Sequence, residues 1–178
     1  MIDLFKWEQD VLVEARQRIY EQRTKMKVDR KSEILVNAKC FGNFDVFADA
    51  RPIHFISRKS KELLAYLVHK KGNSSTTQEL IAVLFEGRAH SYSVGRQFQA
   101  LISSLIKSLR DVGVERIIVK QFNSLAVDIT KIDCDYYNFL DGESDAISQY
   151  VGEYMLGYNW AEFMAKYLDF KLFSDRHS

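Results

Sequence analysis

The sequence predicts an α+β fold, in which three short strands are followed by three helices and a closing hairpin. β-rich runs with short polar joints occupy residues 34–56, and apolar residues recur at helical spacing in three segments between residues 57 and 113. Two further β-rich runs flank Asn123-Ser124. This order is that of a winged helix-turn-helix, in which the third helix enters a DNA groove and the hairpin forms a wing.

Composition limits the classes to which the protein can belong. With 178 residues, 47% of them hydrophobic, the chain can form one domain with appendages or two small domains. It has neither a run of eighteen apolar residues nor a cleavable leader, so we expect no membrane contact and a cytoplasmic location. Cys40 and Cys134 lie far apart without metal-ligand spacing, so we expect buried, reduced thiols and neither metal nor cofactor.

Changes of pattern divide the chain into three expected parts. Residues 1–33 are a linker or dimerisation helix with net charge +1, residues 34–132 are the winged-helix DNA-binding domain with +6, and residues 133–178 are a helical extension with −6. A positive block favours a polyanionic partner, whereas the acidic end would repel phosphates or meet a protein. A dipolar surface without a partner is the alternative explanation.

The N-terminal segment, residues 2–31, is predicted as one long helix with a narrow apolar seam. A coiled-coil strand, a linker helix, the last helix of an upstream domain and a helix packed on its own chain would all have this pattern. The seam is formed by Leu4, Trp7, Val11, Ala15, Ile19 and Met26.

Local sequence signals predict the strands and helices of the middle part, residues 34–132. Strands are expected at residues 34–41, 44–48 and 52–56, as an antiparallel meander. Ser57 should cap a first helix that stops at Gly72 and carries His69 on its surface. Thr76 with Glu79 forms a capping-box pattern for a second helix that ends near Gly87.

The third helix, residues 91–112, has one apolar and one hydrogen-bonding side. Phe98, Ile102, Leu105 and Leu109 form its apolar stripe at about 100° per residue. The opposite side carries small, amide and cationic groups that suit a DNA groove, although any surface helix is polar outside. Residues 116–122 and 125–129 should form the hairpin, so that residues 116–129 are the wing.

The C-terminal part is rich in acidic and aromatic residues. Asp133 or Asp135 should cap a helix over DCDYYNFL. Asn159 with Glu162 forms a second capping-box pattern, which opens a helix that contains Trp160, Phe163, Met164, Tyr167 and Leu168. Its aromatic side chains either extend the core of the winged helix or form an exposed groove for a partner.

The sequence also resembles a known family, the OmpR-type winged helix in the bacterial transcriptional activator domain of SARP-like regulators and response-regulator effector regions. The resemblance covers about residues 35–170. It is carried by CFGNFDVF, RKSKELLAYLVHKKGNSSTTQELIAVLFEG, LIKSLR, DCDYYNFL and GEYMLGYNWAEF. Where members of this family usually have a glycine-rich wing turn followed by an aromatic residue, this chain has KQFNSL at residues 120–125.

This resemblance implies a sequence-specific transcription regulator, of the kind that acts in two-component systems, that binds double-stranded DNA as a homodimer and contacts RNA polymerase or another regulator. By position it implies base contacts from the third helix, phosphate contacts from the starts of the first two helices, and contacts from the wing. The expected DNA-binding residues are Arg96, Gln97, Gln99, Ser103, Lys107, Arg58, Lys59, Thr76, Thr77, Lys120, Gln121 and Asn123.

Two other classes of function differ in how well they fit the sequence. A winged helix that binds protein and no longer binds DNA would fit the near-neutral total charge and the unusual wing. An enzyme is not expected, because the four histidines lie near no nucleophile motif and no phosphate-binding glycine loop is present. Glu153 and Glu162 form a conceivable catalytic pair, but an amphipathic aromatic hairpin explains them without chemistry.

Overall fold

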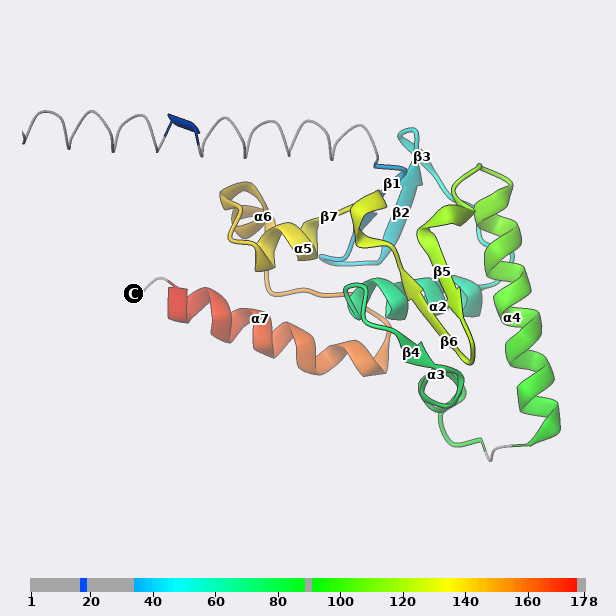
Figure 1. Cartoon of the computed structure of the whole chain (residues 1–178). Helices are drawn as coiled ribbons and strands as arrows, with labels where there is room; N and C mark the ends of the chain where they lie inside the picture. Colours follow the sequence, from blue (N-terminus) through cyan, green and yellow to red (C-terminus); the bar gives the residue numbers. More distant parts are fainter. Residues whose placement is uncertain (1–16, 19–33, 89–90, 176–178) are drawn as a thin grey trace, which may run out of the picture. The chain divides into compact units, whose positions relative to one another are not determined.

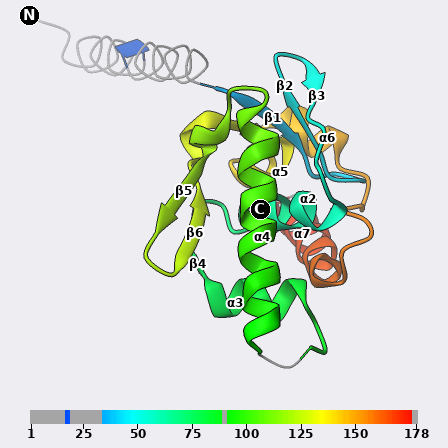
Figure 2. The same cartoon turned by 90° about the vertical axis from the view of Figure 1, so that its right-hand side faces the viewer.

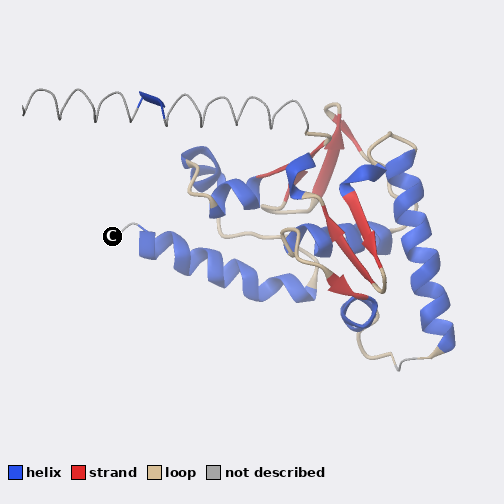
Figure 3. Ribbon diagram, in the orientation of Figure 1, coloured by secondary structure: helices blue, strands red, loops and turns tan. Residues whose placement is uncertain are grey.

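The computed structural model describes residues 17–18, 34–88 and 91–175, and the chain divides into two compact units, Met1–Ile34 and Leu35–Ser178. Gln17 and Arg18 are helical, and the rest of the helix expected over residues 2–31 lies outside the described residues. The second unit is a mixed α+β structure with two small sheets (Figure 1, Figure 3). No helix in the described ranges has the length and apolarity to cross a bilayer.

The first sheet contains the expected meander and one additional strand. β1 (Val36–Lys39), β2 (Asp45–Ala48) and β3 (Arg51–Pro52) pair antiparallel, in the order β3-β2-β1. The sequence did not predict β7 (Ile132–Cys134), which pairs parallel with β1 and places Ile132 opposite Val36. β3 is shorter than the predicted strand 52–56: beyond Ile53, whose N–H donates to Val46 C=O at 2.9 Å, the chain turns to begin the first helix.

Three helices follow: α2 (Arg58–His69), α3 (Thr77–Leu84) and α4 (Tyr92–Arg110). The predicted caps at Ser57 and Thr76 are present, because their hydroxyls accept from backbone N–H groups of the first turns, and the Ser91 hydroxyl caps α4 in the same way. α3 ends at Leu84, before the predicted stop at Gly87, since Phe85 already leaves the helical region at φ −121° and ψ 42°.

The closing hairpin forms a second sheet with a short strand that was not predicted. β5 (Ile118–Gln121) and β6 (Ser124–Val127) pair antiparallel, and β4 (Ser75–Thr76) adds to β6. The predicted first wing strand, 116–122, is shorter in the structure because Glu115–Ile117 form a 3-10 turn. The hairpin runs beside α4 in both views (Figure 1, Figure 2).

The C-terminal extension folds as α5 (Asp135–Leu140), α6 (Ser144–Gln149), the 3-10 turn Asn159–Ala161 and α7 (Glu162–Asp175). Both caps predicted for it are wrong. Cys134 occupies the N-cap position of α5, because the Asp135 carboxylate points instead at the backbone N–H groups of Cys40, Phe41 and Tyr136. The Asn159 side chain caps no helix, because a 3-10 turn precedes α7.

One apolar core runs through both sheets, the helices and the extension. It includes the predicted stripe of α4 together with Tyr137, Phe139 and Met155 from the extension. The expected boundary at residue 132 therefore falls inside β7, a strand of the first sheet.

His69 belongs to the same packed region, which corrects its prediction as a surface residue. Its Nδ1 lies 3.1 Å from the Tyr154 hydroxyl, and its ring contacts those of Tyr66, Tyr136 and Trp160. The prediction failed because the extension covers the end of α2, and sequence periodicity carries no information on such a tertiary contact.

Candidate nucleic-acid interface

The exposed face of α4 is polar and contains no acidic residue. Its core stripe is buried, and Arg96, Gln99, Ser103 and Lys107 are exposed, as the sequence predicts. These four positions recur at spacings of three and four residues, so they share one side of the helix. Neither Arg96 nor Lys107 has an ion-pair partner among the described residues. This face therefore offers two cations that are not neutralised by the protein.

Hydrogen bonds within α4 decide which groups remain available to a ligand. The Ser103 hydroxyl donates to Gln99 C=O at 3.0 Å, so its lone pairs remain free to accept from a base amino group. Gln97 lies on a different edge of the helix, where its amide accepts from Arg88 at 2.7 Å and donates to Ser93 at 3.2 Å. Gln97 is therefore engaged within the protein, whereas the Gln99 side-chain amide forms no hydrogen bond with the described residues.

The wing and the start of α3 form one connected surface. Asn123 C=O, at the wing turn, accepts from Thr77 N–H at 2.9 Å and from the Thr77 hydroxyl at 3.3 Å. The Thr76 hydroxyl accepts from Glu79 N–H at 3.2 Å. Thr77 thus cannot offer its backbone N–H to a phosphate, although Thr76 remains exposed, as do Lys120, Gln121 and Asn123.

Arg58 and Lys59 lie in a different environment. Arg58 lines a cleft together with Asp45 of β2 and Tyr158 of the extension. Lys59 donates to Glu62 at 2.8 Å and lines a groove with Trp160. The two predicted phosphate contacts at the start of α2 therefore adjoin the acidic extension, and are not gathered with the wing.

The acidic residue in the first turn of α3 is neutralised within the protein. Glu79 accepts from Tyr66 Oη at 2.8 Å and from Lys70 Nζ at 3.0 Å. Burial acts to raise the pKa of Glu79, but these two hydrogen bonds and the Lys70 charge outweigh it and lower the pKa. Burial together with the Glu79 contact raises the pKa of Tyr66 to about 12. A phosphate at this end of α3 would meet a compensated carboxylate.

Three exposed residues of this region are not among the expected DNA-binding residues. Tyr92 is 83% exposed at the start of α4, Phe122 is 94% exposed at the wing turn, and Arg110 is exposed at the last position of α4. Arg110 follows Lys107 by three residues and extends the same cationic stripe, as helical spacing predicts. No sequence signal marks an aromatic residue in a turn as exposed.

Cys40, Cys134 and Asp135 form the one described group of ligand-type atoms close enough to hold a metal ion, with one such atom from each residue within 4.8 Å of the others. The two sulfur atoms lie 3.3 Å apart in the core. Burial raises the pKa of the Cys40 thiol well above its usual value, which disfavours the thiolate that a metal needs. The Asp135 oxygens already accept three backbone N–H groups, so the cluster is suited to a structural role.

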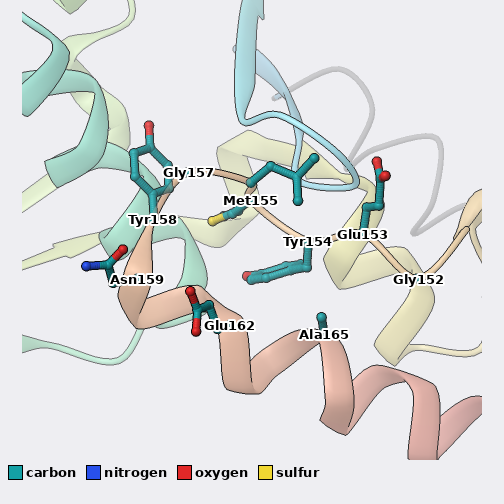
Figure 4. Close-up of a pocket in the computed structure, with 10 residues that line it drawn as sticks. Gly152, Glu153, Tyr154, Met155, Gly157, Tyr158, Asn159, Glu162 and Ala165 are labelled. Atoms are coloured by element: carbon teal, nitrogen blue, oxygen red, sulfur yellow. The ribbon is translucent and has the colours of Figure 1, made fainter.

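The pocket drawn in Figure 4 lies within the extension and includes the two glutamates considered as a catalytic pair. Glu153 and Glu162 both line it, on either side of Tyr154 and Met155, and both are exposed to solvent. Figure 4 shows the two carboxylates pointing away from each other. This arrangement does not present them to one reacting atom.

Comparisons with known proteins add one likeness of fold. No protein-family model and no curated protein matches the sequence. Among solved structures, Mycobacterium tuberculosis EmbR in complex with a low-affinity phosphopeptide is similar, with a TM-score of 0.63 and 16% sequence identity. The aligned region covers 78% of this chain and 42% of the EmbR chain. The likeness supports the mixed α+β, winged-helix type of fold that the sequence predicts.

Proposed function

We propose that this protein is a sequence-specific DNA-binding regulator of transcription. The observation that carries the proposal is the exposed face of α4, which presents Arg96, Gln99, Ser103 and Lys107 without an acidic neighbour on the helix. The arginine can bind guanine bidentately, the glutamine can bind adenine, and the lysine can bind phosphate. α4 would lie in the major groove, with the hairpin beside it as the wing.

The charge distribution supports this placement. The α4 and wing segments, residues 91–110 and 116–127, carry five cations and no carboxylate, whereas residues 133–178 carry net charge −6. A duplex that approaches α4 and the wing would face cationic segments without carboxylates. The electrostatic attraction of these cations for DNA phosphates would speed association. The resemblance of the sequence to OmpR-type effector domains points in the same direction.

In vitro selection from random duplexes tests the proposal directly. We expect enrichment of a consensus, and an affinity for the selected duplex that falls steeply as salt concentration rises. The spacing of repeated half-sites would reveal whether the protein binds as a homodimer. The absence of salt-sensitive binding to any duplex at low ionic strength would refute the proposed function.

Alanine variants assign the contacts. Arg96→Ala should weaken binding by about 1–3 kcal/mol and relax specificity at one base pair. Lys107→Ala should weaken binding to all sequences alike and reduce the salt slope by about one. Lys166→Ala is the matched control, because it removes an exposed cation from α7 and should leave affinity unchanged.

A second candidate is a protein-interaction module, and one observation favours it. α7 exposes a stripe of aromatic side chains, and exposed apolar patches often mark protein-binding surfaces. These are Phe163, Tyr167, Phe170 and Phe173, which are 80%, 52%, 70% and 60% exposed. DNA binding by variants with substitutions on α7 separates the two candidates. A regulator whose α4 reads DNA should keep its DNA affinity in these variants, whereas a protein-interaction module should bind no DNA with or without them.

A further inference from the structure

Two cysteines bring their sulfur atoms together where the first sheet meets the C-terminal extension. Cys40 follows the last residue of β1, whereas Cys134 ends β7 and directly precedes α5. Their Sγ atoms lie 3.3 Å apart, and both side chains are buried. The chain has two cysteines, so any disulfide within one molecule must join this pair. DNA binding through α4 gives these thiols no role.

Backbone contacts hold both cysteines in position. Cys134 pairs with Ala38 of β1 in the first sheet. The Cys40 N–H donates to both carboxylate oxygens of Asp135, at 2.8 and 3.0 Å. The Cys40 C=O accepts from the N–H of Met155, in the extension, at 2.7 Å. The fold therefore places the two sulfur atoms side by side before any bond forms between them.

The remaining gap is short enough to be closed by a covalent bond. A disulfide has an S–S distance of about 2.05 Å, so the two sulfur atoms need to approach by about 1.2 Å. The bond would join positions that are 94 residues apart and enclose α2, α3, α4 and the wing in one covalent loop. Closing a long loop restricts the unfolded chain, which stabilises the folded state.

We propose that Cys40 and Cys134 are a redox-active pair, which closes to a disulfide and joins the first sheet covalently to the start of the extension. With both thiols reduced, this joint is held by strand pairing, hydrogen bonds and packing alone. With the disulfide formed, the joint cannot open without unfolding of the enclosed loop. The stability of the protein thereby depends on the redox poise of its surroundings.

A small disulfide, such as oxidised glutathione, is the co-reactant. The thiolate of one cysteine attacks a glutathione sulfur, which forms a mixed disulfide and releases one glutathione thiol after it takes up the cysteine proton. The second cysteine attacks the protein sulfur of the mixed disulfide and releases the second glutathione thiol. Two protein thiols are thus oxidised, and one glutathione disulfide is reduced to two thiols.

Burial controls when this exchange can begin. It raises the pKa of Cys40, and it keeps a molecule of the size of glutathione away from both sulfur atoms. Exchange therefore begins when the ends of β1 and β7 open, or before the chain has finished folding. Once formed, the buried disulfide is protected from thiol reductants in the same way.

Refolding of the full chain in glutathione buffers tests the proposal. The reduced protein is unfolded in urea and refolded with either oxidised or reduced glutathione. After refolding with oxidised glutathione, the intact mass should be lower by two hydrogen atoms, and a non-reduced peptide map should contain the Cys40 and Cys134 peptides joined. The thermal midpoint of this form should be about 5–10 °C above that of the reduced form.

Single-cysteine variants provide the matched controls. Cys40→Ala and Cys134→Ala cannot form the bond, so the two buffers should give the same thermal midpoint for each. The peptide map of the wild type does not depend on the folding of either variant. Free thiols, separate glutathione adducts on the two cysteines, or disulfide-linked dimers in place of the internal bond would overturn the proposal. So would a cross-linked wild type with the thermal midpoint of the reduced form.

Discussion

The Nδ1 atom of His69 lies 3.1 Å from the hydroxyl oxygen of Tyr154, which joins the end of α2 to the C-terminal extension. The histidine is surrounded by the rings of Tyr66, Tyr136 and Trp160, at centroid distances of 6.0, 6.3 and 5.3 Å. Burial and the nearby Lys70 charge lower the pKa of His69 from 6.5 to about 4. The neutral imidazole is therefore part of the packing between the two regions.

This lowered pKa predicts loss of stability in mild acid. Above pH 6.5 His69 is neutral in both states, and between pH 6.5 and 4 the unfolded chain binds the proton that the folded chain excludes. Stability should fall by about 3 kcal/mol across this window because of His69. Urea unfolding at a series of pH values measures it. In His69→Gln the slope over the same window should be smaller, and an unchanged slope would contradict the assignment.

The thiols of Cys40 and Cys134 should be unreactive in the folded protein. Both are buried, and burial raises the pKa of Cys40, so little thiolate forms at neutral pH. We expect no modification by an aromatic disulfide reagent in native buffer, and modification of both thiols in urea. Rapid labelling of the native protein would show that the β1 and β7 ends open frequently.

Asp135 should be one of the most sensitive polar positions in the protein. Its carboxylate accepts from Cys40 N–H at 2.8 Å, Phe41 N–H at 3.1 Å and Tyr136 N–H at 2.7 Å. Asp135→Ala leaves these donors without a partner and should destabilise the fold by about 3 kcal/mol. The exposed Asp145, in the first turn of α6, offers a control: Asp145→Ala should change the unfolding free energy by less than about 0.5 kcal/mol.

Removal of the extension should unfold the winged helix. A fragment of residues 34–132 lacks most of β7 and the buried side chains of Tyr137, Phe139 and Met155. Circular dichroism should show a non-cooperative thermal profile for this fragment and a cooperative one for residues 34–175. A cooperatively folded 34–132 fragment would show that the extension is an independent addition.

Sequence patterns predicted the elements whose causes are local. The apolar stripe of α4 and the hydroxyl caps at Ser57 and Thr76 depend on residues within one or two turns, and the structure contains them. The elements that the sequence missed depend on distant partners. β7 and β4 are two or three residues long, too short for an alternation pattern, and they exist because Val36 and Leu125 lie opposite them.

The same distinction applies to the candidate site. Helical spacing predicted the exposure of Arg96, Ser103 and Lys107, because a straight helix has one outward side. Spacing could not show that the Thr77 N–H is occupied by Asn123, or that Lys59 lies beside Trp160. Those facts arise from the tertiary contacts of the hairpin and the extension.

The parallel pairing of β1 with β7 also has a consequence for the time at which the protein can fold. Val36 pairs with Ile132, so the first strand cannot complete its sheet until the ribosome has released α2, α3, α4 and the wing. At about 5–20 residues per second, this leaves the edge of β1 unpaired for several seconds of synthesis. During that interval the nascent chain exposes an open strand that a chaperone, or another nascent chain, could bind.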